Sequence, residues 1–182
     1  MENNIIHTAV TKSGKTVSFR YPTIDDAEIL MNYINKISLE KTFILFQGQQ
    51  KTLEDEVKWL EIFTKNKNEN VIILAFIEDK LIGLSDIKLG FSAKNHVGSF
   101  GVTVAKEYRG EGIGKKLMEF VIKESIKNIK DLKIIELECF ASNLIAQNLY
   151  KKFGFKEYGR LPKGLKRRGK FDDAILMYKK VK

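Results

Sequence analysis

The sequence is poor in cysteine, in proline and in long apolar runs. Its 182 residues include one cysteine, Cys139, and two prolines. A single cysteine excludes an internal disulfide and a cysteine-based zinc cluster, which fits a reducing compartment. No apolar run approaches the roughly 18 residues of a membrane-spanning helix, and the first residues lack the pattern of a secretory signal. These absences predict a cytoplasmic protein with no membrane partner and no metal site.

No linker rich in proline or glycine divides the chain, and no internal repeat is visible. The length suits one domain of roughly 100–200 residues. With 43% hydrophobic and 30% charged residues, the composition is that of a globular protein and excludes a disordered or collagen-like chain. We therefore expect one domain over residues 1–182.

The net charge of +9 first suggests a polyanionic partner such as nucleic acid. However, residues 151–182 contain 12 basic and 3 acidic side chains, whereas residues 1–150 contain 20 of each. The excess positive charge therefore belongs to the C-terminal segment alone. This uneven distribution makes a nucleic-acid partner a weak prediction.

Hydrophobic periodicity predicts an α/β fold with a mixed sheet. Helices are expected to begin at Thr23, at Thr52, near Gly112, and at Ser142 or Asn143. A basic loop is expected between the last two strands, over 161–170. The expected strands are 5–11, 16–21, 71–78, 81–91, 96–104, 133–140, 155–160 and 171–179.

The most informative segment is a strand, a short turn and three alternate glycines that open a helix: Gly110, Gly112 and Gly114. Such glycines let several backbone N–H groups converge at a helix N-terminus, which favours a phosphate or pyrophosphate. The side chains of Arg109 and Lys115 would add positive charge. The alternative is that the glycines only turn a strand into a helix. The dinucleotide fingerprint and the P-loop motif both fail on the residues present.

The spacing of Arg109, Gly112 and Gly114 matches R-x-x-G-x-G, and at this point the sequence resembles the GNAT superfamily of acetyl-CoA-dependent N-acetyltransferases. A second segment, 143–155, looks like the family's N-x-x-A-x-x-L-Y-x-x-x-G-F. The resemblance is strong over about 71–158 and weak before it. It implies a mixed, mostly antiparallel central sheet flanked by helices and splayed between the fourth and fifth core strands, here 96–104 and 133–140.

The resemblance also implies acetyl-CoA as cosubstrate and assigns residues to it. The backbone of one strand would bind pantetheine, the N–H groups of the glycine turn would bind the pyrophosphate, and the second motif would contact the cofactor. The residues so implied are Val102, Thr103, Val104, Arg109, Gly110, Glu111, Gly112, Ile113, Gly114, Lys115, Asn143, Ala146 and Tyr150.

The acetyl transfer that this resemblance implies needs an acid for the leaving thiolate and a base for the amine. Tyr150, at the family's tyrosine position, is the predicted acid, with a core aromatic as the alternative. Many relatives place a glutamate in the fourth strand, but 97–101 contains no carboxylate. The remaining candidates for the base are Glu138, Glu136, His96 and a water relay. Of these, we name Glu138 as the predicted base. Cys139 is interpreted as a small buried residue rather than a nucleophile.

The predicted acceptor is a primary amine of a small molecule, either a polyamine, an amino acid or an antibiotic-like amine. The alternatives are a protein N-terminus of the ribosomal type and a non-catalytic acyl-CoA sensor. The 163–170 loop could border the acceptor pocket, with Asp172 or Asp173 meeting an ammonium, or lie in solvent. A homodimer is possible because relatives are often dimers. Four aromatic residues of the first two helical segments could line the pocket or pack: Phe43, Phe46, Trp59 and Phe63.

Overall fold

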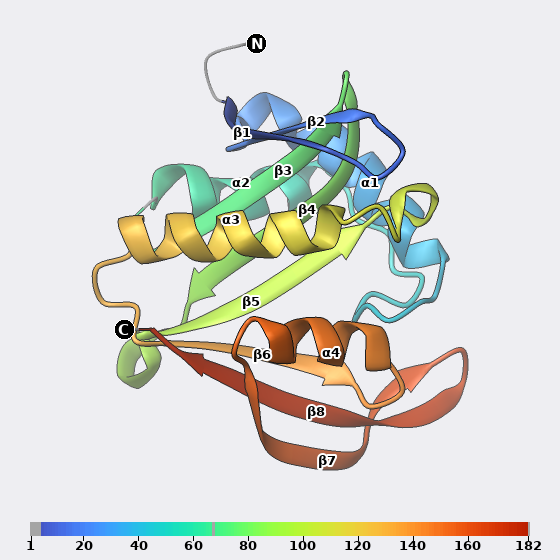
Figure 1. Ribbon diagram of the computed structural model, residues 1–182, viewed down its shortest axis with the longest axis vertical. Coiled ribbons are helices and arrows are strands. Elements are labelled where there is room, and N and C mark those ends of the chain that lie inside the picture. The colour runs from blue at the N-terminus through green and yellow to red at the C-terminus, as the bar shows by residue number, and fades with distance from the viewer. Residues whose placement is uncertain (1–4, 67, 182) are drawn as a thin grey trace.

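The computed structural model describes residues 5–66 and 68–181, and its strands form an eight-stranded mixed sheet (Figure 1). The strand order is β1-β2-β3-β4-β5-β6-β8-β7, and β5–β6 is the parallel pair in an otherwise antiparallel sheet. This arrangement confirms the predicted α/β class. The strands are β1 (Ile5–Val10), β2 (Thr16–Arg20), β3 (Asn70–Ile77), β4 (Lys80–Leu89), β5 (Val97–Val104), β6 (Ile134–Phe140), β7 (Lys156–Arg167) and β8 (Lys170–Lys180).

Four α-helices flank the sheet and begin near the predicted residues. At the start of α2 the Asp55 N–H donates to the Thr52 hydroxyl at 3.2 Å, and the Thr52 N–H donates to the Asp55 carboxylate at 3.0 Å. None of the helices in the described part of the chain is long and apolar enough to cross a membrane. The helices are α1 (Ala27–Leu39), α2 (Leu53–Lys65), α3 (Ile113–Asn128) and α4 (Leu144–Lys152).

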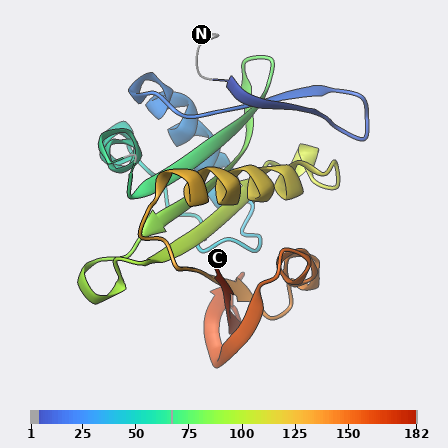
Figure 2. The same ribbon diagram turned by 60° about the vertical axis from the view of Figure 1, so that its left-hand side comes forward.

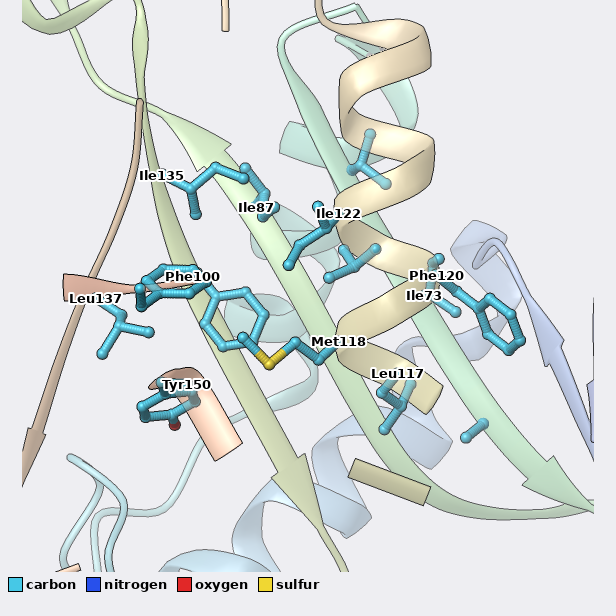
Figure 3. Close-up of a cluster of buried hydrophobic side chains, with 14 of the residues drawn as sticks. Ile73, Ile87, Phe100, Leu117, Met118, Phe120, Ile122, Ile135, Leu137 and Tyr150 are labelled. Carbon is cyan, nitrogen blue, oxygen red and sulfur yellow. The ribbon is translucent and has the colours of Figure 1, made fainter. Parts of the chain in front are cut away.

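The helices cover both faces of the sheet because β3 is apolar on both of its faces. Side chains alternate along a strand, so Ile73 packs with the cluster under α3 while Ile72 packs with the cluster under α1 and α2. Figure 1 shows α3 across one face, with α1 and α2 behind the other. In the α3 cluster, Met118 and Ile122 extend from the helix toward β5 and β4 (Figure 3).

The parallel contact between β5 and β6 is short. Three residue pairs join the strands, from Val97–Ile134 to Ser99–Glu136, and the ladder ends there. Beyond Ser99 the two strands diverge, and β6, β7, β8 and α4 lie to one side of β5 (Figures 1 and 2). This confirms the predicted splay, and it leaves the remainder of β5 without a partner on its β6 side.

The prediction of a basic loop over 161–170 was wrong. Strand β7 continues to Arg167 and β8 begins at Lys170, so a two-residue turn joins them. Both turn residues, Arg168 and Gly169, have positive φ, at 49° and 78°, as a tight hairpin turn of the type I′ class requires. An irregularity in register between Leu161 and Leu165 carries the strand past Pro162 and beyond the predicted end at residue 160.

A buried ion pair fixes the connection from β2 to the first helical turn. The Arg20 guanidinium donates to both oxygens of Asp26, at 2.6 and 2.8 Å, and the Thr23 N–H donates to the same carboxylate at 2.7 Å. Asp26 is 7% exposed. Burial by itself raises the pKa of this carboxyl, but the Arg20 and Thr23 donors outweigh burial and hold the pKa below its ordinary value.

We expect Asp26→Asn to lower the free energy of unfolding by about 3 kcal/mol at neutral pH, because it leaves the Arg20 charge buried without its partner. The folded-state pKa of Asp26 lies below its unfolded value. The carboxylate's contribution is therefore complete above about pH 4 and is lost as the pH falls through the folded-state value. Denaturant titrations of both proteins at several pH values should converge in acid. The exposed neighbour Asp25→Asn is the control, and an equal loss in that variant would contradict the assignment.

Candidate active site

The glycine turn between β5 and α3 presents a row of backbone N–H groups. Gly110 and Gly112 have φ of 84° and 87°, a left-handed conformation that other residues rarely adopt. Within the described chain, no backbone acceptor is recorded for the N–H groups of residues 110–115. These donors stand at the N-terminus of α3, where the helix dipole also favours negative charge. The turn therefore has the donor set of a phosphate-binding cradle.

The side chains around this turn are used for structure rather than for the cradle. The Arg109 guanidinium donates to Glu40 at 2.5 Å and to the Val104 carbonyl at 2.9 Å. The Arg109 N–H donates to the Lys106 carbonyl at 3.3 Å, so the open donors begin at Gly110 rather than at the predicted Arg109. The Glu111 carboxylate accepts the Ser13 N–H at 2.9 Å.

The other predicted residues of α3 differ in exposure. Ile113 is buried in the core under the helix, whereas Lys115 is exposed and has no ion pair recorded in the described chain. A Cβ built on Gly114 would lie 3.6 Å from the Val104 side chain. The structure thus brings the backbone of the predicted segment together and leaves the Lys115 side chain exposed in the first turn of α3.

A cavity of about 320 Å³ lies where β5 and β6 diverge. Residues 100–103 of β5 and 138–140 of β6 form two of its walls, and Asn143 and Tyr150 of the α4 segment form a third. The Thr103 hydroxyl is 3.0 Å from that of Tyr33. The predicted strand segment Val102–Val104 therefore connects the cavity with the glycine turn.

The second predicted motif shapes the α4 side of the cavity. The Asn143 side-chain oxygen accepts the Ala146 N–H at 3.2 Å and caps α4. The helix ends at Lys152, and Gly154 follows its C-cap with a φ of 85°. Asn143 was one of the two predicted cap residues, and it lines the cavity as well.

Tyr150 is a buried residue of the cavity wall. It is 8% exposed, and its ring packs edge-on against Phe100 at 6.0 Å between centroids. Figure 3 places it at the border of the buried cluster, with the hydroxyl oxygen turned away from the other labelled side chains. Burial, followed by the influence of Cys139, raises the pKa of Tyr150 above its ordinary value. The Tyr150 ring therefore packs as a core aromatic while the residue also lines the cavity, and its role as the acid stays a prediction.

Asp86 is a carboxylate of the cavity that sequence reasoning missed. It lies on β4 opposite Gly101 of β5. A Cβ at position 101 would lie 2.9 Å from the Asp86 Oδ1, so the glycine leaves room for the carboxylate. Burial raises the pKa of Asp86 to about 7, with Lys88 acting in the opposite direction. Only the pairing of β4 with β5 could have identified Asp86, because the carboxylate that β5 lacks lies on the neighbouring strand.

The predicted candidates for the base separate in the structure. Glu138 is exposed and lines the cavity. Glu136 shares its strand face but lies outside the cavity wall and pairs with Lys94 at 3.4 Å. His96 lies directly before β5, at the opposite end of that strand from the glycine turn. Its carbonyl accepts the N–H groups of Lys133 and Ile134 at the start of β6. The cavity therefore contains two carboxylates near the splay, Asp86 and Glu138.

Cys139 also lines the cavity, and its environment suppresses the thiolate. Burial, Glu157 and Glu138 together raise the pKa of this thiol to about 11. A thiol with that pKa is protonated at neutral pH and is a poor nucleophile. The geometry therefore agrees with the interpretation of Cys139 as a small buried residue.

The tip of the β7–β8 hairpin is joined to the α1–α2 loop, which forms the opposite wall. Arg168 donates to the carbonyls of Glu40 and Lys41, each at 3.2 Å. The Arg167 guanidinium lies 4.1 Å from the ring of Phe43, which lines the cavity. The basic segment is thus neither a free loop nor part of the pocket lining. Its arginines bind the α1–α2 loop, and we call this contact the clamp on the cavity wall.

Two further expectations about the acceptor side need correction. The Asp173 carboxylate accepts from Arg160 at 2.8 Å and from the Lys163 N–H at 2.9 Å, and Asp172 accepts from Ser142. These partners hold both carboxylates within the hairpin region, and neither lines the cavity.

The aromatic residues of the first two helical segments divide between pocket and core. Phe43, Phe46 and Trp59 line the cavity. Phe63 is buried with the α1 and α2 cluster and packs edge-on against Trp59 at 4.8 Å. In the described residues, no group of three or more potential ligands of the His, Cys, Asp or Glu type is arranged to hold a metal ion.

Comparison with known proteins places this arrangement in a family. The model of the acetyltransferase (GNAT) family matches residues 34–155. The chain is 34% identical over 84 residues to the L-amino acid N-acetyltransferase AaaT of Escherichia coli, an alignment that covers 46% of this chain and 51% of that protein. It is 28% identical over 160 residues to an N-alpha-acetyltransferase of Sulfurisphaera tokodaii, covering 82% and 86% of the two chains.

A solved structure shows the same fold over nearly the whole chain. The acetyltransferase of the GNAT family from Streptococcus pneumoniae superposes with a TM-score of 0.84 at 27% identity, covering 91% of this chain and 99% of that one. The curated E. coli relative, in contrast, is matched over about half of its length, at 51%.

Gly112→Ala tests the cradle. A Cβ at position 112 meets nothing within 4 Å, so the cost is the left-handed backbone itself, about 1–2 kcal/mol. We expect relief of that strain to turn the N–H groups away and to weaken coenzyme A binding about ten-fold, measured by calorimetry. Gly169→Ala is the matched control, because its φ is 78° and its Cβ is equally unobstructed. It should lose similar stability with unchanged affinity; equal affinities in both variants would contradict the cradle.

Proposed function

The chain belongs to the GNAT family of acetyltransferases, and we propose that it transfers the acetyl group of acetyl-CoA directly to a primary amine of a small molecule. One observation carries the proposal: a buried tyrosine and a partly buried carboxylate, Tyr150 and Asp86, line the same cavity beside the glycine-turn strand. The N–H donors of residues 110–115 supply the matching anion cradle.

The geometry supports an extended path for acetyl-CoA. The pyrophosphate would accept the N–H groups of residues 110–115, and Lys115 would add a cation at the same place. The pantetheine amides would pair with the side of β5 that has no β6 partner beyond Ser99. Such a path leads from the glycine turn along Val104, Thr103 and Val102 into the cavity. Of the predicted cofactor residues, Val102, Thr103 and Asn143 line the cavity, whereas Ile113 is buried and would contribute its backbone N–H alone.

Asp86 is proposed as the base. An alkylamine with a pKa of about 10.4 is protonated at pH 7, so presenting it as a nucleophile costs about 4.6 kcal/mol. The Asp86 carboxylate would accept the ammonium proton, and the nitrogen lone pair would then attack the thioester carbonyl carbon. A base with a pKa of about 7 suits this exchange at neutral pH. Glu138, the candidate from sequence, stays a second candidate and is more exposed than Asp86.

Tyr150 is proposed as the acid. As the tetrahedral adduct collapses, the carbon–sulfur bond breaks and the sulfur leaves with its electron pair as a thiolate. Burial in this cavity raises the pKa of the Cys139 thiol to about 11, and a thiolate formed beside it would be disfavoured for the same reason. The Tyr150 hydroxyl, which burial keeps protonated, would donate its proton to the sulfur. The second proton that the nitrogen loses as it becomes an amide would then restore the Tyr150 hydroxyl, so that coenzyme A leaves as the thiol and Asp86 keeps the first proton.

The clamped wall supports a small acceptor rather than a protein chain. The hairpin tip is bonded through Arg168 to the α1–α2 loop, and we expect this contact to hold the cavity wall in place against a bulky acceptor. A protein N-terminus is the alternative, and the archaeal relative is named for that activity. An acyl-CoA sensor is a third possibility, which the pair of Tyr150 and Asp86 disfavours. Release of coenzyme A on mixing acetyl-CoA with amines, but not with N-terminal peptides, is the result that supports the proposal.

Tyr150→Phe removes the proposed proton donor and keeps the ring that packs on Phe100. We expect kcat to fall about 10²-fold or more, with little change in the KM for acetyl-CoA. The measurement is steady-state release of coenzyme A. Tyr158→Phe is the control, because Tyr158 is 54% exposed on β7. Equal kcat in the Tyr150 variant and the wild type would remove the acid role.

Asp86→Asn removes the proposed base. In the wild type we expect kcat at saturating amine to fall as the pH drops below about 7, because the carboxylate becomes protonated. In the variant we expect kcat to fall about 10²-fold and this dependence on pH to disappear.

The matched control is Glu138→Gln, an exposed carboxylate of the same cavity. If Glu138→Gln loses the acid limb and Asp86→Asn keeps it, Glu138 is the base. Unfolding measurements separate catalysis from folding. Because burial raises the pKa of Asp86, its ionised form opposes folding, and the Asn variant should be at least as stable as the wild type near pH 8.

A further inference from the structure

The acceptor end of the cavity has more acidic than basic side chains, although the whole chain carries +9. Lys51 is the basic residue recorded in its described wall. The positive charge of the C-terminal hairpin does not compensate, since Arg168 is bonded outward to backbone carbonyls. The acidic residues of the wall are Asp55, Glu56, Asp86 and Glu138.

Glu56 is the unexpected member of this set. It lies on α2, is 6% exposed, and lines the cavity. In the described chain no hydrogen bond or ion pair of its side chain is recorded, and its carboxylate oxygens keep some accessible surface, whereas the neighbouring Glu54 pairs with Lys58 at 2.6 Å. Burial raises the pKa of Glu56, and Lys51 acts against that rise. A buried carboxylate without a partner is costly, and a cation in the cavity would offset that cost.

The surfaces around Glu56 suit a cation on an aliphatic chain. Trp59 and Phe46 line the same wall, and Leu30 and Ile34 of α1 complete it. Aromatic faces attract ammonium groups, and aliphatic walls accommodate methylene groups. Lys51 already shows this preference, with its ammonium 5.5 Å from the Phe46 ring centroid.

We propose that the acceptor is an aliphatic diamine or polyamine: one amine faces Asp86 and is acetylated, while a second ammonium pairs with Glu56. This inference rests on the proposed function, because Asp86 must mark the reacting end. The two carboxylates come from different elements, β4 and α2, so they hold the two ends of the acceptor independently. An amino acid would place its own carboxylate among the acidic side chains of the wall, which disfavours it.

Three amines of equal chain length test the proposed class: diaminobutane, butylamine and aminobutyrate. They present a second cation, no second charge and an anion, respectively. We expect kcat/KM to be highest for diaminobutane, by about ten- to a hundred-fold over butylamine, as for one charge-assisted hydrogen bond. Aminobutyrate should be the poorest acceptor. The measurement is coenzyme A release under identical ionic strength.

Glu56→Gln tests the residue itself. We expect the KM for diaminobutane to rise about ten-fold or more, with kcat and the KM for butylamine little changed, because the reacting end is untouched. Glu54→Gln is the matched control: it removes the same charge from the same helix, but the Glu54 side chain is 76% exposed. It should leave all three amines unaffected.

Binding can be followed without turnover, because Trp59 is the single tryptophan of the sequence and lines the cavity. Diaminobutane should change its fluorescence in the presence of coenzyme A, and Glu56→Gln should weaken that response. If the kcat/KM for butylamine or aminobutyrate equals that for diaminobutane, the diamine inference is overturned while the proposed function stands. If diaminobutane binds and no amine releases coenzyme A, the proposed function fails instead. An unchanged KM and fluorescence response in Glu56→Gln would overturn the role of Glu56.

Discussion

The end of the β5–β6 ladder after Ser99 is the constraint on which the rest of the site depends. Continued pairing would use the backbone groups of β5 that the structure leaves available, and would close the cavity between the strands. The opening is held by packing, because the rings of Tyr150 and Phe155 sit against Phe100 at centroid distances of 6.0 and 6.1 Å. The ring of Tyr150 therefore packs on β5 while the same residue lines the cavity between the strands.

Charge is sorted along the chain in a way that net charge conceals. The basic C-terminal hairpin uses Arg168 to grip the backbone at Glu40 and Lys41. The Glu40 carboxylate in turn receives Arg109 from the glycine turn. The end of α1 thus connects the anion cradle with the clamp on the cavity wall. Arginines stabilise the frame, and the cavity wall keeps more acidic than basic side chains, which is in keeping with the cationic acceptor proposed above.

Sequence reasoning succeeded where the signal was local. The left-handed glycines, the Asn143 cap and the Thr52 cap each depend on a few neighbouring residues, and all lie where the sequence placed them. It failed where strand pairing decided the outcome. The irregularity in register after Leu161 and the turn at Arg168 are stabilised by partners across the hairpin, so a run of lysine and arginine read as a loop. Which aromatics line the pocket was likewise undecided until the helices were placed.

Asp86 shows most clearly why such a site is invisible in one dimension. Taken alone, a carboxylate whose pKa is raised to about 7 opposes folding, since stability falls as the pH rises from about 4 to 7. Gly101 taken alone weakens a strand by about 0.5–1 kcal/mol. Neither residue is favourable for a packed sheet. The two are paired across β4 and β5, however, and the missing Cβ of Gly101 leaves the space that the Asp86 carboxylate occupies. Two locally unfavourable residues in register are better explained by what the carboxylate does in the cavity than by what either contributes to the fold.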